Sequence, residues 1–320
     1  MTFRIGVIGA GTHGARYLRH ALADVPGLTA TALCRRDPEA GAKLAGELGL
    51  RFHRDPLALI ADREVDGVVI ATPPASHGHL AEAVLGAGKP LLLEKPLTAT
   101  LQEAEHLEDL DARSATPLFL AQTLRWNPVI KTVKDMWPLL GKVHLIRLAQ
   151  RLEPTTLAWQ HDPHDPTGGS VLITGVHLID TVRFLTGREF ASVTAWTDQI
   201  LNHAVEDAFL ARAVLGDGCW VSLEVSKYTR SRACWLEAVG EDGQLMADYL
   251  KGGITLRQGP VEERSDIAAA VPTLPLVLGD WLRTVRDGAP PPVTVTDGVA
   301  VMQVVDACYR SARTGRAVDI

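Results

Sequence analysis

The chain has 320 residues with a formal net charge of -6 at pH 7, and 46% of its residues are hydrophobic and 22% charged. This composition is that of an ordinary folded protein and excludes a disordered chain, while the negative charge argues against nucleic acid or an anionic membrane surface as the main partner. The four cysteines (Cys34, Cys219, Cys234 and Cys308) lack CxxC spacing and are too sparse for a disulfide scaffold, which favours a reducing cytoplasm.

The sequence predicts neither a targeting segment nor a membrane span. Met1-Thr2-Phe3-Arg4 leads directly into an apolar strand without a hydrophobic leader. No uncharged apolar run reaches the roughly 18 residues that a membrane helix needs. The length is sufficient for a large core and predicts two domains.

Short apolar strands alternate with amphipathic helices from residue 3 to about residue 121. This alternation is typical of a parallel sheet covered by helices on both faces. Asp37-Pro38, Asp55-Pro56 and the capping box Thr100-Leu101-Gln102-Glu103 mark helix starts, and Gly49 and Gly86 mark helix ends. The expected strands are Phe3–Ile8, Thr29–Leu33, Gly67–Ala71, Pro90–Leu93 and Pro117–Ala121.

The rest of the chain has longer, alternating strands joined by Gly-Asp turns. Apolar and polar side chains alternate from Val221 to Val225, and Gly216-Asp217-Gly218 joins this strand to the one before it. A helix is expected from Asp297 to Ala312. We predict an α/β protein with a Rossmann domain, a doubly wound parallel sheet, at residues 1–121, and an α/β domain with an open, mainly antiparallel sheet at residues 122–320.

The first strand runs directly into Gly9-Ala10-Gly11-Thr12-His13-Gly14, which precedes an amphipathic helix at Ala15–Ala23. In such a strand-to-helix turn the glycines allow a tight turn, close approach of the backbone to a ligand, and packing of helix on strand. The helix N-terminus then presents unpaired N–H groups and a positive dipole end to a diphosphate. The sequence therefore predicts a nicotinamide dinucleotide held by this loop, with a purely structural turn as the alternative.

The end of the second strand decides which dinucleotide is expected. An acid there would bind the ribose 2′-hydroxyl of NAD, but the chain reads Leu33-Cys34-Arg35-Arg36-Asp37. A guanidinium grips a phosphate through two hydrogen bonds, so Arg35 or Arg36 predicts NADP as the preferred cofactor. The alternative is a solvated basic turn in which Asp37 serves NAD or caps the next helix.

Two further loops follow strands of the predicted parallel sheet. Glu94-Lys95-Pro96 lies where ligands bind in doubly wound sheets, and a partly desolvated lysine there has a lowered pKa that suits proton exchange. Pro96 fixes the turn and is a candidate cis proline. Thr72-Pro73-Pro74, with His77 at the start of the next helix, is expected to border the dinucleotide, unless it is only a Pro-rich loop capped by Ser76.

The stretch from Gly168 to Asp180 contains a second candidate for proton transfer. If it is helical, His177 and Asp180 lie one turn apart on one face, so the acid can orient or charge the imidazole. The alternative is a buried histidine with a structural role. The loop His161-Asp162-Pro163-His164-Asp165-Pro166 only superficially resembles a metal clip, and we expect no metal site.

Taken together, these motifs resemble the Gfo/Idh/MocA family of glucose-fructose oxidoreductase, inositol dehydrogenase and rhizopine catabolism proteins. The resemblance covers nearly the whole chain and depends on the ordered set of motifs that follows. They are the Gly9 to Gly14 loop, Val65 to Pro74 with His77, Ala87 to Pro90 leading to Glu94-Lys95-Pro96, Arg125-Trp126-Asn127-Pro128, Gly168 to Asp180, and Ser311 to Val318.

This resemblance implies a Rossmann domain, a second domain whose open sheet forms dimer or tetramer contacts, and NAD(P)-dependent redox chemistry on a sugar, cyclitol or related polyol. It also implies that Lys95 is the catalytic lysine, His177 the acid/base or substrate-orienting histidine, and Glu94 a support on the cofactor side. Many polyol dehydrogenases of the family carry Asp four residues before the histidine, where this chain has Ile173. Either Lys95 and His177 suffice, or Asp162 or Asp165 substitutes, or the chemistry differs.

We therefore expect a cytoplasmic, NADP-preferring oxidoreductase that moves a hydride between nicotinamide and a carbinol carbon. Polyols need hydrogen bonds and an aromatic wall, for which Arg125, Trp126, Trp159 and Thr174 are the candidates. The small-molecule substrate and a second copy of the chain, in a homodimer or homotetramer, are the expected partners. The alternatives are an NAD-dependent enzyme that cleaves or rearranges glycosides without net redox, and a catalytically silent, dinucleotide-binding regulatory protein.

Overall fold

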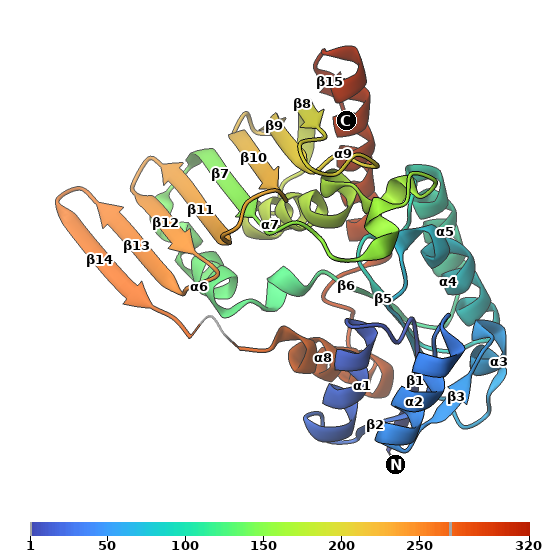
Figure 1. Cartoon of the computed structure of the whole chain (residues 1–320). Helices are drawn as coiled ribbons and strands as arrows, with labels where there is room; N and C mark the ends of the chain where they lie inside the picture. Colours follow the sequence, from blue (N-terminus) through green and yellow to red (C-terminus); the bar gives the residue numbers. More distant parts are fainter. Residues whose placement is uncertain (1, 269–270) are drawn as a thin grey trace. The chain divides into compact units, whose positions relative to one another are not determined.

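Two sheets organise the chain in the computed structural model, which describes residues 2–268 and 271–320 (Figure 1). The first compact unit contains the described residues up to Thr123 together with Pro272–Val299, and the second contains Leu124 onwards and Ala300–Ile320. The division into domains at residues 121 and 122 stays a proposal, because the unit boundaries follow packing and the chain returns to the first unit near its end.

The first unit is built on a six-stranded parallel sheet with strand order β3-β2-β1-β4-β5-β6. Its order reverses between β1 and β4, and in doubly wound sheets ligands bind beyond the carboxyl ends of the strands at such a point. The predicted Rossmann sheet is confirmed, with one strand, β3, that the sequence did not reveal. The strands are β1 Phe3–Ile8, β2 Leu28–Cys34, β3 Arg51–His53, β4 Gly67–Ile70, β5 Leu91–Glu94 and β6 Leu118–Ala121.

Most of the residues predicted to start or end helices in this unit do so. Asp37 and Asp55 accept backbone N–H bonds as N-caps, and Thr100 and Glu103 form the capping box. Gly49 ends its helix with φ of 68°, but Gly86 is still helical, and Gly88 with φ of 66° follows instead. The helices are α1 Gly14–Ala23, α2 Pro38–Leu48, α3 Pro56–Ala61, α4 His77–Gly86, α5 Leu101–Arg113 and α8 Thr273–Asp287, with a 3-10 turn η1 at Pro74–Ser76.

Helix α8 packs on α1 although more than two hundred residues separate them in the chain. The ring of Trp281 meets Phe3 edge to face at 5.7 Å, and Arg286 donates to the carbonyl oxygen of Gly27 at 2.8 Å. Beyond α8, the carbonyl of Val293 accepts a bond from the backbone N–H of Leu120. The returning segment is therefore part of the first unit's core.

The second unit is built on a nine-stranded sheet with order β14-β13-β12-β11-β7-β10-β9-β8-β15. Its neighbouring strands are antiparallel except for the parallel pair β7 and β10, so the predicted open, mainly antiparallel sheet is confirmed. The strands are β7 Val143–Arg151, β8 Phe190–Asp198, β9 Ala208–Leu215, β10 Trp220–Ser226, β11 Ala233–Gly240, β12 Gln244–Asp248, β13 Gly253–Gln258, β14 Val261–Asp266 and β15 Val318–Asp319.

The helices of this unit pack on the sheet, with α6 against β12 and β13 and α7 against β7. The predicted helix at Asp297–Ala312 is present and longer, because it starts at Val295 and ends at Thr314. The helical elements are η2 Thr123–Trp126, α6 Pro128–Met136, η3 Trp137–Leu140, η4 Ala158–His161, η5 Pro166–Gly168, the π-helical turn η6 Val171–Gly175, α7 Val176–Thr186 and α9 Val295–Thr314.

Large apolar side chains are exposed on several strands of the nine-stranded sheet. Trp220 is 68% exposed, Met246 48%, Trp196 47% and Leu210 44%. Trp196 and Leu210 pair across β8 and β9, and Arg212 lies over the Trp196 ring at 5.9 Å. We call these four side chains the apolar sheet patch. Across the described ranges, no helix has the length and apolarity to cross a bilayer.

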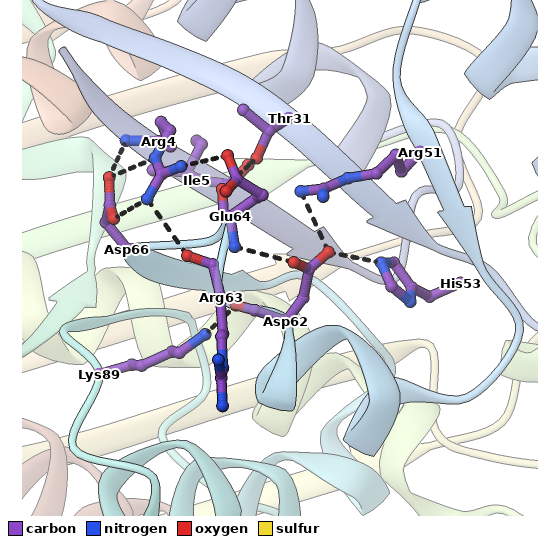
Figure 2. A network of polar contacts seen from close by, with 10 residues as sticks. All are labelled: Arg4, Ile5, Thr31, Arg51, His53, Asp62, Arg63, Glu64, Asp66 and Lys89. Carbon is purple, nitrogen blue, oxygen red and sulfur yellow. Dashed lines mark hydrogen bonds and ion pairs between the residues drawn. The ribbon is translucent and has the colours of Figure 1, made fainter.

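A polar network in the first unit joins Arg4 of β1 and His53 of β3 to the segments that precede β4 and β5 (Figure 2). Arg4 donates to Asp66 Oδ1 at 2.7 Å and to Oδ2 at 3.0 Å, and it also pairs with Glu64. Asp62 holds His53 at 3.0 Å, while its carbonyl accepts a bond from Lys89 at 2.6 Å. The network joins β1, β3 and the segments around β4. It therefore helps to fix the strands whose carboxyl ends carry the predicted cofactor loops.

Candidate active site

The glycine loop after β1 has the geometry of a cradle for a diphosphate. Gly9 has φ of 88°, and a Cβ there would lie 2.6 Å from the backbone of Ala71. A Cβ on Gly14 would clash with the carbonyl oxygen of Gly9, so the start of α1 approaches the loop too closely for a side chain at this position. At Gly11, by contrast, a Cβ would meet no described atom within 4 Å. Two glycines are therefore required by packing, and the third leaves open space beside the loop.

The start of α1 is suited to an anion. Thr12 and His13 lie in the turn before the helix, and His13 at the N-cap makes no side-chain cap bond within the described chain. The first turn carries no acidic residue among those described. The N–H groups of Ala15 and Arg16 bond to the carbonyls of Gly11 and His13, so it is the positive end of the helix dipole that favours a diphosphate here. The loop thus fits the dinucleotide that the motif predicts.

The basic turn after β2 lies beside the same loop. Arg35 reaches the carbonyl oxygen of Ala10 through Nη1 at 3.4 Å, and Arg36 is exposed. Asp37 accepts the backbone N–H of Ala40 at 3.1 Å as the N-cap of α2. The carboxylate of Asp37 therefore has a structural task, and the guanidinium of Arg35 is next to the loop.

Glu94 at the end of β5 is a buried carboxylate near the carboxyl ends of the first unit's strands. It is 4% exposed and accepts hydrogen bonds of 2.6 Å from His13 Nε2 and from the hydroxyl of Tyr17. Burial by itself would raise the pKa of Glu94, but the charge and hydrogen bond of His13 and the charge of Lys95 hold that pKa at about 2. The group is therefore an anion that ties the glycine loop to the end of β5.

Lys95 follows directly and is half-buried, with a cis bond to Pro96 as the sequence allowed. Burial lowers the pKa of the Lys95 ammonium, although the charge of Glu94 opposes this effect. An amine with a lowered pKa gives up and regains a proton near neutral pH more readily than an ordinary surface lysine. The position and environment both suit proton exchange with a hydroxyl.

His77 is fully buried and joins two of the predicted cofactor loops. Its Nδ1 lies 2.8 Å from the carbonyl oxygen of Pro96, and its Nε2 lies 2.9 Å from that of Thr72. Burial lowers the pKa of His77. Ser76 does not cap α4 but donates to the Thr72 hydroxyl at 2.7 Å and to the Pro73 carbonyl at 3.0 Å. His77 therefore links the Thr72 loop to the Pro96 loop through buried hydrogen bonds.

In the second unit the predicted helix around His177 begins with an irregular turn. Val171–Gly175 is π-helical and α7 continues from Val176, so His177 is the second residue of the regular helix. Such π-helical turns occur frequently at functional sites. Ile173, where the family resemblance led us to expect an acid, lies in this turn. The sequence analysis treated a helix here as a condition and gave no sign of the π-helical turn.

Asp180, which the sequence placed next to His177 as an acid partner, forms a buried ion pair with Arg125. The guanidinium donates to Oδ2 at 2.9 Å through Nε and to Oδ1 at 2.7 Å through Nη2. The side chains are 1% and 10% exposed, respectively. Both residues lie in the second unit, where the pair joins η2 to α7 through bonds to both carboxylate oxygens.

The other residues expected at a substrate wall differ in exposure. Trp126 and Thr174 are buried, which leaves little of either side chain for a ligand. Trp159 in η4 is half-buried, and Arg125 is held by Asp180 and lies 5.5 Å from the Phe184 ring. Trp159 is therefore the best placed of the four to offer an aromatic surface.

A small cavity of about 80 Å³ lies in the second unit, near η4 and the end of β10. Lys227 is 8% exposed at this cavity and donates to Gln160 Oε1 at 2.7 Å. Burial raises the pKa of Glu206, which accepts bonds from the Tyr309 hydroxyl and the Val171 N–H. The sequence did not point to these residues, because nothing in the pattern indicates that they meet. The lining residues are Pro154, Thr155, His161, Leu201, Asn202, Glu206, Asp207 and Lys227.

Two family models match this chain across most of its length. Residues 3–121 match the model described as "Oxidoreductase family, NAD-binding Rossmann fold", and residues 139–320 match "Oxidoreductase family, C-terminal alpha/beta domain", both of the Gfo/Idh/MocA family. The chain belongs to the Gfo/Idh/MocA family. It is thus an oxidoreductase-family protein with an NAD-binding Rossmann fold.

Comparison with individual proteins agrees with this membership. The chain is 30% identical to inositol 2-dehydrogenase 2 of Saccharopolyspora erythraea, covering all of this chain and 96% of the relative. It is 29% identical to the rhizopine catabolism protein MocA of Rhizobium meliloti, covering 95% and 93%. Its structure is similar to GenD2 from gentamicin A biosynthesis in complex with NAD, with a TM-score of 0.89, 27% identity and coverage of 100% and 96%.

Proposed function

We propose that this protein transfers a hydride between a nicotinamide dinucleotide and a carbinol carbon of a sugar, cyclitol or related polyol. The observation that carries the proposal is the arrangement at the strand ends of the first unit. There a diphosphate cradle is tied through His13 and Glu94 to a half-buried Lys95. The names of the relatives, an inositol dehydrogenase among them, support the substrate class.

The residues that would hold the dinucleotide are the glycine loop from Gly9 to Gly14, with Thr12 and His13, and the loop of Thr72 and Pro73, which His77 supports. When bound, the nicotinamide supplies or accepts the hydride. Lys95 exchanges the proton of the substrate hydroxyl, and burial, which lowers its pKa, supports this role. His177 orients the substrate or shares the proton exchange.

The acid missing at Ile173 is not replaced by the two loop acids in this proposal. Asp162 Oδ1 accepts the backbone N–H of His164, and Asp165 Oδ1 accepts the N–H of Thr167. Both carboxylates therefore have local structural tasks. We infer that Lys95 and His177 carry the proton chemistry, with Asp180 holding α7 in place through Arg125.

We also propose that NADP is preferred over NAD. Support comes from Arg35, which lies against the glycine loop, and from Asp37, whose carboxylate caps α2. The test is equilibrium binding of both dinucleotides to the Arg35→Met and Arg36→Met variants. We expect at least one variant to lose on the order of tenfold in affinity for NADP and little for NAD. Equal affinity of the wild-type protein for both would contradict the preference.

The redox proposal itself is tested at Lys95. Lys95→Met should lower turnover by roughly 10²–10⁴-fold, because a general acid/base contributes about that much, while dinucleotide affinity changes little. Turnover is followed by reduced-nicotinamide absorbance with a panel of sugars and polyols. Lys131→Met on α6 of the second unit is a matched control and should leave turnover unchanged. Unchanged turnover in Lys95→Met would remove the lysine from the mechanism.

Location and assembly belong to the same proposal. Cysteine usage supports a reducing cytoplasm, since Cys34, Cys219, Cys234 and Cys308 are all free and buried. The exposed Trp196 and Leu210, which pair across β8 and β9, and the exposed Trp220 on the neighbouring β10 support a homodimer or homotetramer through this sheet. Sedimentation experiments at several protein concentrations measure the oligomeric state directly.

A further inference from the structure

Gln122 carries a buried acceptor for which the described residues supply no donor. Its side chain is 1% exposed, and Oε1 has no hydrogen-bond partner among the described residues. Buried amide groups in native proteins are nearly always paired, because leaving one unpaired forfeits the hydrogen bonds it had in water. Exchanging the oxygen and nitrogen of the amide would leave an unpaired NH₂ group in the same place. The amide head therefore points to a ligand.

The position of this amide is on the crevice side of the first unit. Gln122 comes directly after β6, where its N–H donates to the Leu120 carbonyl at 3.1 Å as the chain turns. In the parallel register Glu94 pairs with Ala121, so Lys95 and Gln122 are the first residues beyond the carboxyl ends of neighbouring strands. The unpaired acceptor thus belongs to the strand-end loop next to the one that carries the proposed catalytic lysine.

The strand order indicates which part of a dinucleotide would reach Gln122. The diphosphate cradle follows β1, and the arginines that would read the adenosine ribose follow β2, on one side of the reversal. The nicotinamide half would then lie on the other side of the reversal, towards β4, β5 and β6. Next to the reacting C4 of that ring is a primary carboxamide, which has both an acceptor and two N–H donors.

We infer that Gln122 recognises the nicotinamide carboxamide and thereby sets the orientation of the ring against Lys95. The carboxamide NH₂ group supplies the donor that Gln122 Oε1 lacks. This inference rests on the proposed function, because it needs a nicotinamide dinucleotide. Gln122 is then a residue that binds the cofactor and positions it, without exchanging a proton.

The test compares a natural dinucleotide with its 3-acetylpyridine counterpart, which keeps the carbonyl but lacks the NH₂ donors. Dissociation constants are measured by calorimetry without substrate, for NAD or NADP, whichever binds more tightly. The wild-type protein should bind the natural form on the order of tenfold more tightly, which is the effect of one buried hydrogen bond. This measurement needs no variant, and equal affinity would overturn the inference.

Gln122→Met provides the second arm, because methionine has a similar size and no amide. The variant should bind the natural dinucleotide on the order of tenfold more weakly and should no longer distinguish it from the acetylpyridine form. The melting temperature of the free variant should be unchanged or higher, since an unpaired buried atom is removed. A purely structural role predicts the opposite pattern, with a lower melting temperature and intact discrimination, and would overturn the inference.

The control is Gln150→Met, the same exchange at a buried glutamine on β7 of the second unit. It should keep the discrimination between the two dinucleotides. Loss of affinity for both forms by the same factor in Gln122→Met would assign the amide to a ribose hydroxyl and overturn the carboxamide assignment. If the wild-type protein bound neither NAD nor NADP, the proposed function would fail first and the inference with it.

Discussion

Asp180 and Arg125 form a bidentate ion pair that is almost completely shielded from water, 55 residues apart in the chain. Removing one partner of such a pair leaves an uncompensated buried charge, which costs about 3–5 kcal/mol. We therefore expect Arg125→Met to lower the free energy of unfolding by this amount in denaturant titrations. The double variant Arg125→Met with Asp180→Leu should regain part of the loss, because it buries no charge.

An exposed ion pair of the same unit is the control for that measurement. Arg232 pairs with Glu153, and the two side chains are 52% and 43% exposed. Breaking an exposed ion pair costs far less free energy than breaking a buried one, so Glu153→Gln should have little effect. Equal losses of unfolding free energy in Glu153→Gln and Arg125→Met would contradict the larger contribution that we assign to the buried pair.

Glu94 should make stability depend on pH in acid. Its pKa is about 2 in the folded protein against an ordinary value of 4.5, so the folded state favours the anion. The resulting stabilisation is fully present above about pH 4.5 and is lost as the pH falls towards 2. It amounts to roughly 3 kcal/mol, and Glu94→Gln should flatten this part of the profile. A pH series of unfolding free energies checks this, and identical profiles for both proteins would refute it.

The polar network around Arg4 should be stabilising at one residue and neutral at another (Figure 2). Asp66 accepts the backbone N–H and two guanidinium bonds of Arg4, and these bonds lower its pKa. Since the side chain is 33% exposed, we expect Asp66→Asn to cost only about 1–2 kcal/mol. Glu64→Gln, at a side chain that is 61% exposed, should change stability by less than about 0.5 kcal/mol.

The apolar sheet patch should control assembly. A charge at the centre of an apolar interface is costly to bury, so Trp220→Glu should shift an oligomer towards monomers in sedimentation experiments. The control is Leu57→Glu on α3 of the first unit, where the side chain is 56% exposed. The assembly proposal fails if wild-type protein is monomeric at all concentrations, or if both variants dissociate alike.

Much of the fold could be predicted because its signals are local. Asp37, Asp55 and Thr100 act within three residues of their own helix starts, and the glycine loop is read from one short turn. Strand β3 was missed because three residues carry no periodicity and depend on pairing with β2. The π-helical turn at Val171–Gly175 likewise reflects packing and not a residue pattern.

The sequence allowed us to name candidate site residues, but it did not reveal which of their side chains contact one another. Lys95, Glu94 and His77 were identified by position at strand ends and helix starts. Glu94 holds His13 from 81 positions away, and no spacing rule reveals such a contact. The unpaired Oε1 of Gln122 could not be predicted from the sequence either, because it depends on the positions of all the surrounding described atoms.

Helix α8 has a practical consequence for work on isolated parts of the protein. A fragment ending near residue 123 would lack Trp281, and Phe3 and the edge of β6 would lose the cover that the late segment provides. Such a fragment should precipitate or remain poorly ordered on expression. Joining residues 272–299 behind it through a short flexible spacer should restore solubility, so a nucleotide-binding module can be engineered only as a spliced polypeptide.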